Sequence, residues 1–177
     1  MVINLLSFLT LLSNIFVVLF IVLHIFSIKK IYVNLIIKLI EKKGGEIAFI
    51  FSLVATLGSL YFSEIALFEP CKLCWFQRIF MYPLVVILGV SLFKKTKDVF
   101  YYVQPLSAVG ALIAIYHYYF QINPNPLAPC SSVGFSVSCN LNFFTHYGYI
   151  TIPWMSFSAF LYIFLVSLVK LRSKNNS

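Results

Sequence analysis

The chain has 177 residues, of which 61% are hydrophobic and only 10% are charged. A soluble domain of this length needs more polar surface, so the composition excludes a soluble globular protein. The net charge is +8, but the basic residues cluster at the ends of apolar runs, as topology signals of membrane proteins do. We therefore expect an all-α integral membrane protein that does not bind nucleic acid.

Five apolar runs are predicted to be transmembrane helices. They cover about residues 4–28, 46–68, 75–93, 99–120 and 150–170. Each has about the 20 residues that cross the hydrocarbon core, and backbone groups in lipid must be satisfied within the segment. The first run lacks a preceding basic region and a following small-residue cleavage site, so we interpret it as a span rather than a signal peptide.

The positions of the basic residues predict the orientation of these spans. If the lysine-rich segments face the cytoplasm, all but two of the 13 Lys and Arg residues lie inside, and the exceptions are Lys72 and Arg78. The N-terminus and the segments around Cys71 and 121–149 then lie outside, and the C-terminus lies inside. This arrangement predicts a multi-pass protein of the cell membrane.

The segment 31–43 differs from the spans around it. Its polar residues, such as Lys38 and Glu41, fall on one helical face and its leucines and isoleucines on another, which predicts an amphipathic helix on the cytoplasmic surface. A plain linker is the alternative. We expect residues 1–45 to form an additional N-terminal unit, 46–170 a four-helix bundle and 171–177 a cytoplasmic tail.

All four cysteines fall on the predicted outer side, where disulfides persist. They are Cys71, Cys74, Cys130 and Cys139. Three pairings are open, although Cys71 with Cys74 is a natural local pair and Cys130 with Cys139 closes a short loop. Structural bridging is the alternative for the later pair. A bridge between residues three apart constrains little, so the first pair favours thiol exchange.

Cys74 and Arg78 are predicted to act together. Pro70 precedes the pair, and a helix is expected to begin at about Cys74, where a helix N-terminus stabilises a thiolate. Arg78 lies one turn deeper, roughly 6 Å along the axis. This cation is also suited to hold a small anionic or carbonyl-bearing ligand dissolved in the bilayer, with snorkelling toward headgroups as the alternative.

The stretch YHYYFQ at the outer end of the fourth run places His117 and Gln121 near the predicted depth of Arg78. We expect them to hydrogen-bond the head group of that ligand, with an interfacial aromatic belt as the alternative. No metal site is expected. Covalent haem attachment is excluded because Trp75 rather than His follows Cys74, and the second cysteine pair is too widely spaced for a typical zinc site.

The stretch CKLCWFQR, followed by MYPL, resembles the first outer loop of the DsbB family, the quinone-dependent disulfide bond formation proteins. The BdbC-type branch is the most similar. The YHYYFQ stretch and the later cysteine pair match that family in type and order. The resemblance covers about residues 46–170, and the first span is an addition to the family's four-helix core.

The resemblance implies a reaction as well as a fold. Cys130 and Cys139 would oxidise a soluble thioredoxin-fold thiol oxidase, DsbA- or BdbD-like, with Cys130 carrying the mixed disulfide. Electrons would then pass to Cys71 and Cys74, and Cys74 beside Arg78 would reduce a membrane quinone, either ubiquinone or menaquinone.

Two alternatives remain. A vitamin K epoxide reductase-like protein performs similar chemistry on a similar bundle, but there the loop cysteines precede the C-x-x-C pair, whereas here Cys71 and Cys74 come first. A non-enzymatic membrane subunit with two structural disulfides would keep both bridges oxidised under all conditions.

Overall fold

The computed structural model describes residues 2–25, 30–94, 96, 98–123 and 138–175. Its helices are α1 Val2–Ile25, α2 Lys30–Leu60, the π-helix η1 Tyr61–Ile65, α3 Lys72–Lys94, α4 Phe100–Ile122 and α5 Ile152–Asn175. No strand occurs among the described residues, where His146 and Ile150 form an isolated β-bridge. The all-α prediction is confirmed.

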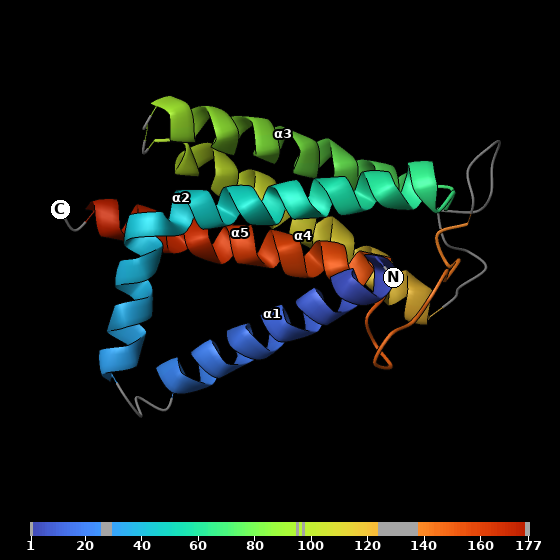
Figure 1. Ribbon diagram of the computed structural model, residues 1–177, viewed down its shortest axis with the longest axis horizontal. Helices are drawn as coiled ribbons and strands as arrows, with labels where there is room; N and C mark the ends of the chain where they lie inside the picture. The colour runs from blue at the N-terminus through green and yellow to red at the C-terminus, as the bar shows by residue number, and fades with distance from the viewer. Residues whose placement is uncertain (1, 26–29, 95, 97, 124–137, 176–177) are drawn as a thin grey trace.

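Helices α2 to α5 form a bundle in which they run side by side between two ends, as Figure 1 shows. α4 packs along α5 and α3, and α2 packs against α3 and α5. α1 is inclined to the bundle and contacts α2 and α5. The additional N-terminal span therefore lies against the outside of a four-helix core.

Four helices contain stretches long and apolar enough to cross a membrane. These stretches are Val2–Leu19, Ile36–Ile65, Lys72–Lys94 and Ile152–Ser173. The remaining helix, α4, matches the predicted run 99–120 in position and length, but its tyrosines, Gln104 and Pro105 make it less apolar. Two of its polar side chains, Ser107 and His117, are buried within the protein, so they need not face lipid.

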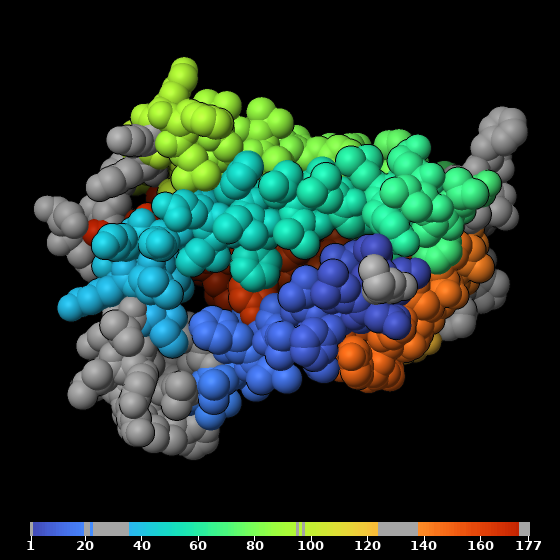
Figure 2. All heavy atoms as spheres, viewed as in Figure 1, coloured from blue at the N-terminus to red at the C-terminus, as the bar shows by residue number. Residues whose placement is uncertain are grey.

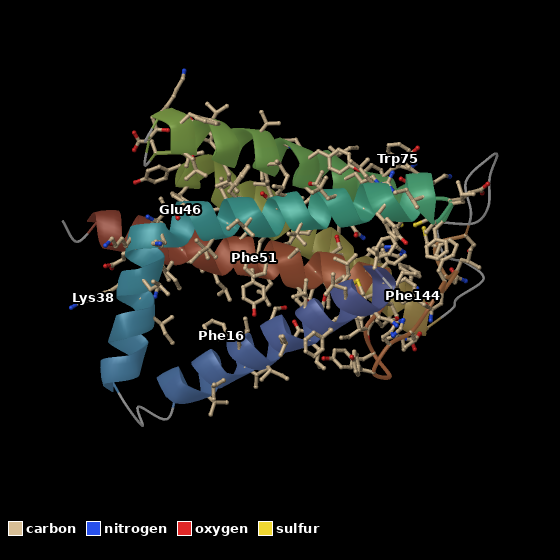
Figure 3. The ribbon with its side chains drawn as sticks, viewed as in Figure 1. Phe16, Lys38, Glu46, Phe51, Trp75 and Phe144 are labelled. Carbon is tan, nitrogen blue, oxygen red and sulfur yellow. The ribbon has the colours of Figure 1, made fainter. Side chains whose placement is uncertain are left out.

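Helix α2 joins two elements that the sequence separates. The predicted amphipathic segment 31–43 is helical and continues into the second span. The helix bends between the labelled residues Lys38 and Glu46 (Figure 3). A Cβ atom on Gly44 would come within 2.9 Å of the side chain of Lys170, so glycine lets α2 approach α5 closely, and helices commonly bend at paired small residues.

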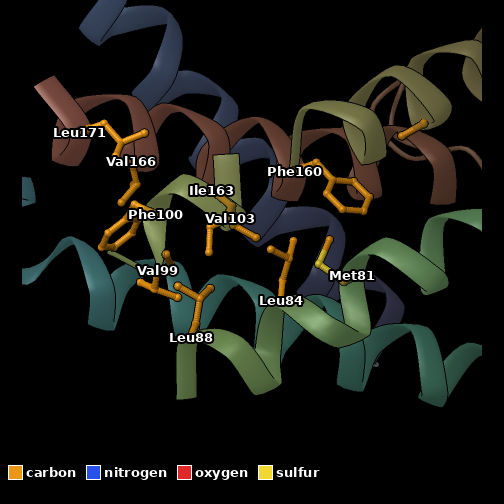
Figure 4. Close-up of a cluster of buried hydrophobic side chains, with 12 residues drawn as sticks. Met81, Leu84, Leu88, Val99, Phe100, Val103, Phe160, Ile163, Val166 and Leu171 are labelled. Atoms are coloured by element: carbon orange, nitrogen blue, oxygen red, sulfur yellow. The ribbon is translucent and has the colours of Figure 1, made fainter. Parts of the chain in front are cut away.

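The core lies where α3, α4 and α5 meet, and Figure 4 shows its buried apolar side chains. Leu84, Val103, Phe160 and Ile163 are completely buried there. A Cβ atom on Gly110 would lie 2.2 Å from the ring of Phe160. Small residues of this kind allow helices in membranes to pack at short distances, so Gly110 permits the close contact between α4 and α5.

The two ends of the bundle differ in character. Lys38 and Glu46 lie toward one end, and Trp75 and Phe144 lie toward the other (Figure 3). The second end gathers the end of α2, the start of α3, the end of α4 and the segment that leads into α5. All cysteines that the structure describes are in these segments, which positions the site considered next.

Candidate active site

Cys71 is the residue immediately before α3, and its sulfur caps that helix. The backbone N–H of Cys74 donates to the Cys71 Sγ at 3.3 Å, and Trp75 N–H donates to the Cys71 carbonyl at 3.1 Å. We expected the helix to begin at about Cys74, which is wrong, because α3 begins at Lys72. The N–H group of Cys74 in the first turn therefore donates to the sulfur of Cys71.

The two sulfurs of the C-x-x-C pair are unbonded and lie 3.0 Å apart. The hydrogen bond from the Cys74 thiol lowers the pKa of Cys71 from 9.0 to about 4, assisted by His117 and opposed by burial. A hydrogen bond from a neighbouring thiol is effective because it stabilises only the charged form. The reduced pair therefore holds its thiolate at Cys71 and its remaining proton at Cys74.

His117 of α4 is buried between the two cysteine-bearing segments. Its Nε2 lies 3.5 Å from the Cys71 Sγ and 3.2 Å from the carbonyl oxygen of Cys139, and its Nδ1 lies 2.9 Å from the Gln77 Nε2. Because an amide nitrogen only donates, Nδ1 accepts and the imidazole proton resides on Nε2. His117 thus directs an N–H toward the Cys71 sulfur and the Cys139 carbonyl.

Arg78 is held by the last turn of α2. Its Nε donates to the Ser59 hydroxyl at 3.0 Å, its Nη2 donates to the Ser59 carbonyl at 3.2 Å, and the guanidinium lies over the Trp75 ring at 5.1 Å. These contacts are all within the protein, so the orientation of the guanidinium does not depend on lipid headgroups. Two of its nitrogens take part in these bonds, and the guanidinium's other N–H groups remain for a ligand.

Cys74, Arg78 and Tyr82 follow one another at intervals of four residues and line one cavity of about 160 Å³. This spacing places all three on one face of α3. The Tyr82 hydroxyl is buried and has no hydrogen-bond partner among the residues that the structure describes. Sequence analysis missed Tyr82, although its spacing from Cys74 and Arg78 was a usable signal.

The cavity suits a six-membered ring that bears carbonyl oxygens. An apolar cavity of about 150 Å³ accommodates a benzene ring, so the volume is sufficient. The unpartnered hydroxyl of Tyr82 and the remaining donors of Arg78 are both hydrogen-bond donors to carbonyl oxygen. The residues that would hold such a ligand are therefore Arg78 and Tyr82, with Cys74 in the same lining.

His117 and Gln121 belong to a separate, smaller recess that also includes Cys71 and Cys74. The Gln121 side chain donates to the Leu141 carbonyl at 3.3 Å. Neither residue lines the larger cavity. The structure thus brings Cys74 and Arg78 together as expected, but it places His117 beside the sulfur of Cys71 instead of beside the guanidinium.

The later cysteine pair is described in part. Cys139 is disulfide-bonded and buried, and it packs with Cys71, Leu73 and Cys74. Cys130 lies outside the described residues. A disulfide is therefore in direct contact with a free dithiol, which is the arrangement that thiol–disulfide exchange requires.

The site also contains a cluster of atoms of the kind that bind metal ions. The sulfurs of Cys71 and Cys74 and a ring nitrogen of His117 all lie within 4.8 Å of one another. Thiolate and imidazole are ligands for soft ions such as Zn²⁺ and Cu⁺. This set contains three ligands and uses the same sulfurs that exchange needs, so the absence of a metal site remains a prediction.

Comparisons with known proteins agree with the sequence pattern. The family "Disulfide bond formation protein DsbB" matches residues 45–170. The "Probable disulfide formation protein C 1" of Bacillus anthracis is 42% identical over 126 residues, which are 70% of this chain and 88% of that protein. The "Disulfide bond formation protein C" of Bacillus subtilis is 45% identical over 120 residues, 67% of this chain and 85% of that protein.

No solved structure gives a significant match. The family match includes α3, α4, most of α5 and the spanning part of α2, and so contains every site residue named above, while α1 precedes it. The match and the level of identity confirm the resemblance to these proteins. The chain belongs to the DsbB family of disulfide bond formation proteins.

Proposed function

We propose that the protein is a membrane thiol oxidase that reoxidises a soluble thioredoxin-fold thiol oxidase and passes the electrons to a membrane quinone. The observation that carries this proposal is the position of the free dithiol, in which Cys71 packs against the disulfide-bonded Cys139 and Cys74 lines the ring-sized cavity. Membership of the DsbB family supports the same conclusion.

The first step takes place at the later cysteine pair. A thiolate of the reduced partner attacks the disulfide of Cys130 and Cys139, and Cys130 carries the mixed disulfide. The partner's second thiol then closes its own disulfide, so the partner loses two electrons and two protons and the loop pair becomes a dithiol. The partner is DsbA- or BdbD-like and soluble, and it approaches from the outer side.

The second step moves the two electrons from the loop pair to the first pair. Cys139 packs with both Cys71 and Cys74, so its thiolate attacks the Cys74 sulfur of the oxidised pair without a large movement and Cys71 leaves. The thiol of Cys130 then attacks Cys139 and releases Cys74. Exchange reforms the loop disulfide and leaves Cys71 and Cys74 reduced, with electrons and protons conserved. The low pKa of Cys71 favours its release as thiolate, because a leaving thiol with a lower pKa departs faster.

His117 assists this exchange. Its Nε2–H faces both the Cys71 sulfur and the Cys139 carbonyl, and Gln77 holds the required tautomer by donating to Nδ1. We therefore assign His117 to the exchange between the cysteine pairs, whereas the sequence suggested a role at the ligand head group. Gln121, which fixes Leu141 two residues after Cys139, supports the same loop.

The third step oxidises the first pair at the cavity. A quinone held in this cavity would supply the oxidant, taking two electrons from the first pair and two protons, one from Cys74 and one from solvent. Arg78 stabilises negative charge that develops on a ring oxygen, and it is preorganised for this by Ser59. Tyr82 donates to a carbonyl oxygen. Cys74 gives up its proton, and the Cys71–Cys74 bond closes.

The proposed reaction also gives the orientation of the bundle in the membrane. We propose that the cysteine end of the bundle faces the outside of the cell membrane and that Lys38 and the C-terminus face the cytoplasm. Residues 46–170 then form the catalytic bundle, 1–45 an additional span and surface helix, and 171–177 a tail. A vitamin K epoxide reductase-like assignment is disfavoured by cysteine order, and a purely structural role is disfavoured by the free dithiol.

The direct test is quinone reduction by the purified protein in detergent, supplied with a reduced thioredoxin-fold oxidase. The variants Cys74→Ser and Cys130→Ser are measured alongside, with Ser63→Ala as a control outside both pairs. Quinone consumption in the unmodified protein and the control, but in neither cysteine variant, supports the proposal. If neither ubiquinone nor menaquinone is consumed and the partner's thiols stay reduced, the proposal is wrong.

A further inference from the structure

We infer that α1 is a wall of the quinone cavity and determines which quinones it accepts. The inference rests on the function proposed above and adds a specificity-determining element to the same site. α1 precedes residues 45–170, the part that matches the DsbB family, so this wall is not part of the family's matched core.

One face of α1 lines the cavity. Leu6, Leu9, Thr10 and Ser13 border the same space as Cys74 and Arg78. Their spacing of three, four and seven residues is that of a single helical face. The side of α1 turned away from the bundle is exposed, with Leu12 48% and Ile15 56% accessible, and Leu9 at the edge of the cavity face is 45% accessible, so this side is available to lipid. α1 therefore separates the cavity from the bilayer.

The contacts that hold α1 occur at the same level as the cavity. The Tyr162 hydroxyl of α5 donates to the Ser13 carbonyl, and the Ser158 hydroxyl donates to the Asn14 side chain at 2.9 Å. A Cβ atom on Gly58 would lie 3.3 Å from Leu6, so glycine permits close contact with α2. Figure 2 shows the N-terminal half of α1 lying against α2 and the segment before α5.

The chemistry of this wall suits the apolar part of the ligand. Leu6 and Leu9 are hydrocarbon, and the hydroxyls of Thr10 and Ser13 are already bonded to the carbonyls of Leu6 and Thr10. The α1 residues that line the cavity therefore offer no free side-chain donor to a carbonyl oxygen, and the unpartnered Nδ2 of Asn14 lies outside this lining. Because Arg78 and Tyr82 lie on α3, polar and apolar recognition are divided between two helices. The occupant is a quinone whose ring substituents or hydrocarbon tail contact α1.

The test compares Thr10→Phe, which fills the cavity from α1, with Leu12→Phe, which adds a phenyl ring to the exposed face. Leu6→Ala, which removes side-chain atoms, is a second cavity variant if Thr10→Phe folds poorly. The KM for a short-tailed ubiquinone and a short-tailed menaquinone is measured together with the KM for the reduced partner. Binding without turnover is measured by quenching of tryptophan fluorescence in the Cys74→Ala background.

We expect Thr10→Phe to weaken quinone binding and raise the quinone KM roughly tenfold, because a pocket rejects ligands that are one group too large by about this factor. Leu6→Ala changes the ratio of the two quinone affinities. Leu12→Phe leaves the quinone KM unchanged, and none of the variants changes the KM for the reduced partner. If the cavity variants match Leu12→Phe while the unmodified protein binds and reduces quinone, this inference alone is wrong. If the unmodified protein binds no quinone, the proposed function fails with it.

Discussion

The Nε2 of His117 lies 3.5 Å from the Sγ of Cys71, although 46 residues separate them in the chain. The same nitrogen lies 3.2 Å from the carbonyl oxygen of Cys139. One buried imidazole thus contacts the first cysteine pair and the backbone of the second. This relationship gives the exchange between pairs a fixed hydrogen-bond donor, and four predictions follow from this geometry and its surroundings.

Replacing His117 by Gln should raise the pKa of Cys71 and slow exchange between the pairs at neutral pH. The thiolate of Cys71 is present above about pH 4 because its pKa is lowered to about 4, and His117 contributes to that lowering. Loss of the imidazole moves the pKa of Cys71 upward, toward the ordinary value of 9.0. The measurement is the ultraviolet absorbance of the thiolate against pH in protein whose first pair is reduced.

His146→Gln is the matched control, since His146 lies in the loop and pairs with Ile150 through backbone hydrogen bonds. It should leave the titration of Cys71 unchanged. An unshifted titration in His117→Gln, with a folded protein, would show that the imidazole does not act on the sulfur.

Arg78→Lys should raise the quinone KM by roughly tenfold or more and leave the partner KM unchanged. Lysine keeps the charge but has no planar set of donors that can bond Ser59 and a ring oxygen together. A hydrogen bond to a charged group contributes about 1.5–3 kcal/mol, which supports this magnitude. Lys72→Ala, which removes an exposed cation beside Cys71, is the control. Normal quinone kinetics in Arg78→Lys would show that the Arg78 guanidinium does not bind the quinone.

Tyr82→Phe should weaken quinone binding by about 1 kcal/mol, roughly fivefold, without lowering the stability of the protein. The hydroxyl has no partner among the described residues, so its loss removes an unsatisfied buried group in the unliganded protein. Fluorescence quenching by quinone measures binding, and thermal unfolding measures stability. Tyr102→Phe, at a side chain 67% exposed, is the control. A large loss of stability with unchanged quinone binding would indicate a purely structural role.

Gly110→Ala should destabilise the bundle by about 1–3 kcal/mol, because the new methyl group would overlap the ring of Phe160. Combining it with Phe160→Leu should recover part of the loss, since the smaller side chain makes room. Thermal unfolding of the single and double variants measures the coupling. Strictly additive effects would argue against direct contact between α4 and α5 at this point.

Much of the architecture is local and was predictable from the sequence. The lengths of the apolar runs predict the helices because backbone groups in lipid must be paired within each segment. The spacing of Cys74 and Arg78 predicts one helical face, and the cavity includes both. The amphipathic stretch 31–43 is helical and continues into the second span through Gly44 and Gly45, and the absence of a side chain at Gly44 lets α2 approach α5.

The start of α3 shows the limit of local reasoning. Helix α3 begins at Lys72, two residues before the expected start at Cys74, so the backbone N–H of Cys74 donates to the sulfur of Cys71. Pro70 marks the boundary only approximately, because helix ends depend on which side chain caps the free N–H groups.

The sequence by itself determined that this is an all-α membrane protein with its cysteines toward one end and a cation one turn below Cys74, because those features depend on hydrophobicity, charge and helical spacing. Tertiary structure alone decided that His117 meets Cys71, that Tyr82 borders the cavity with a hydroxyl that has no partner in the described part of the chain, and that α1 closes one side of it. These relationships join different helices, and their distances are set by how side chains pack, which no single stretch of sequence encodes.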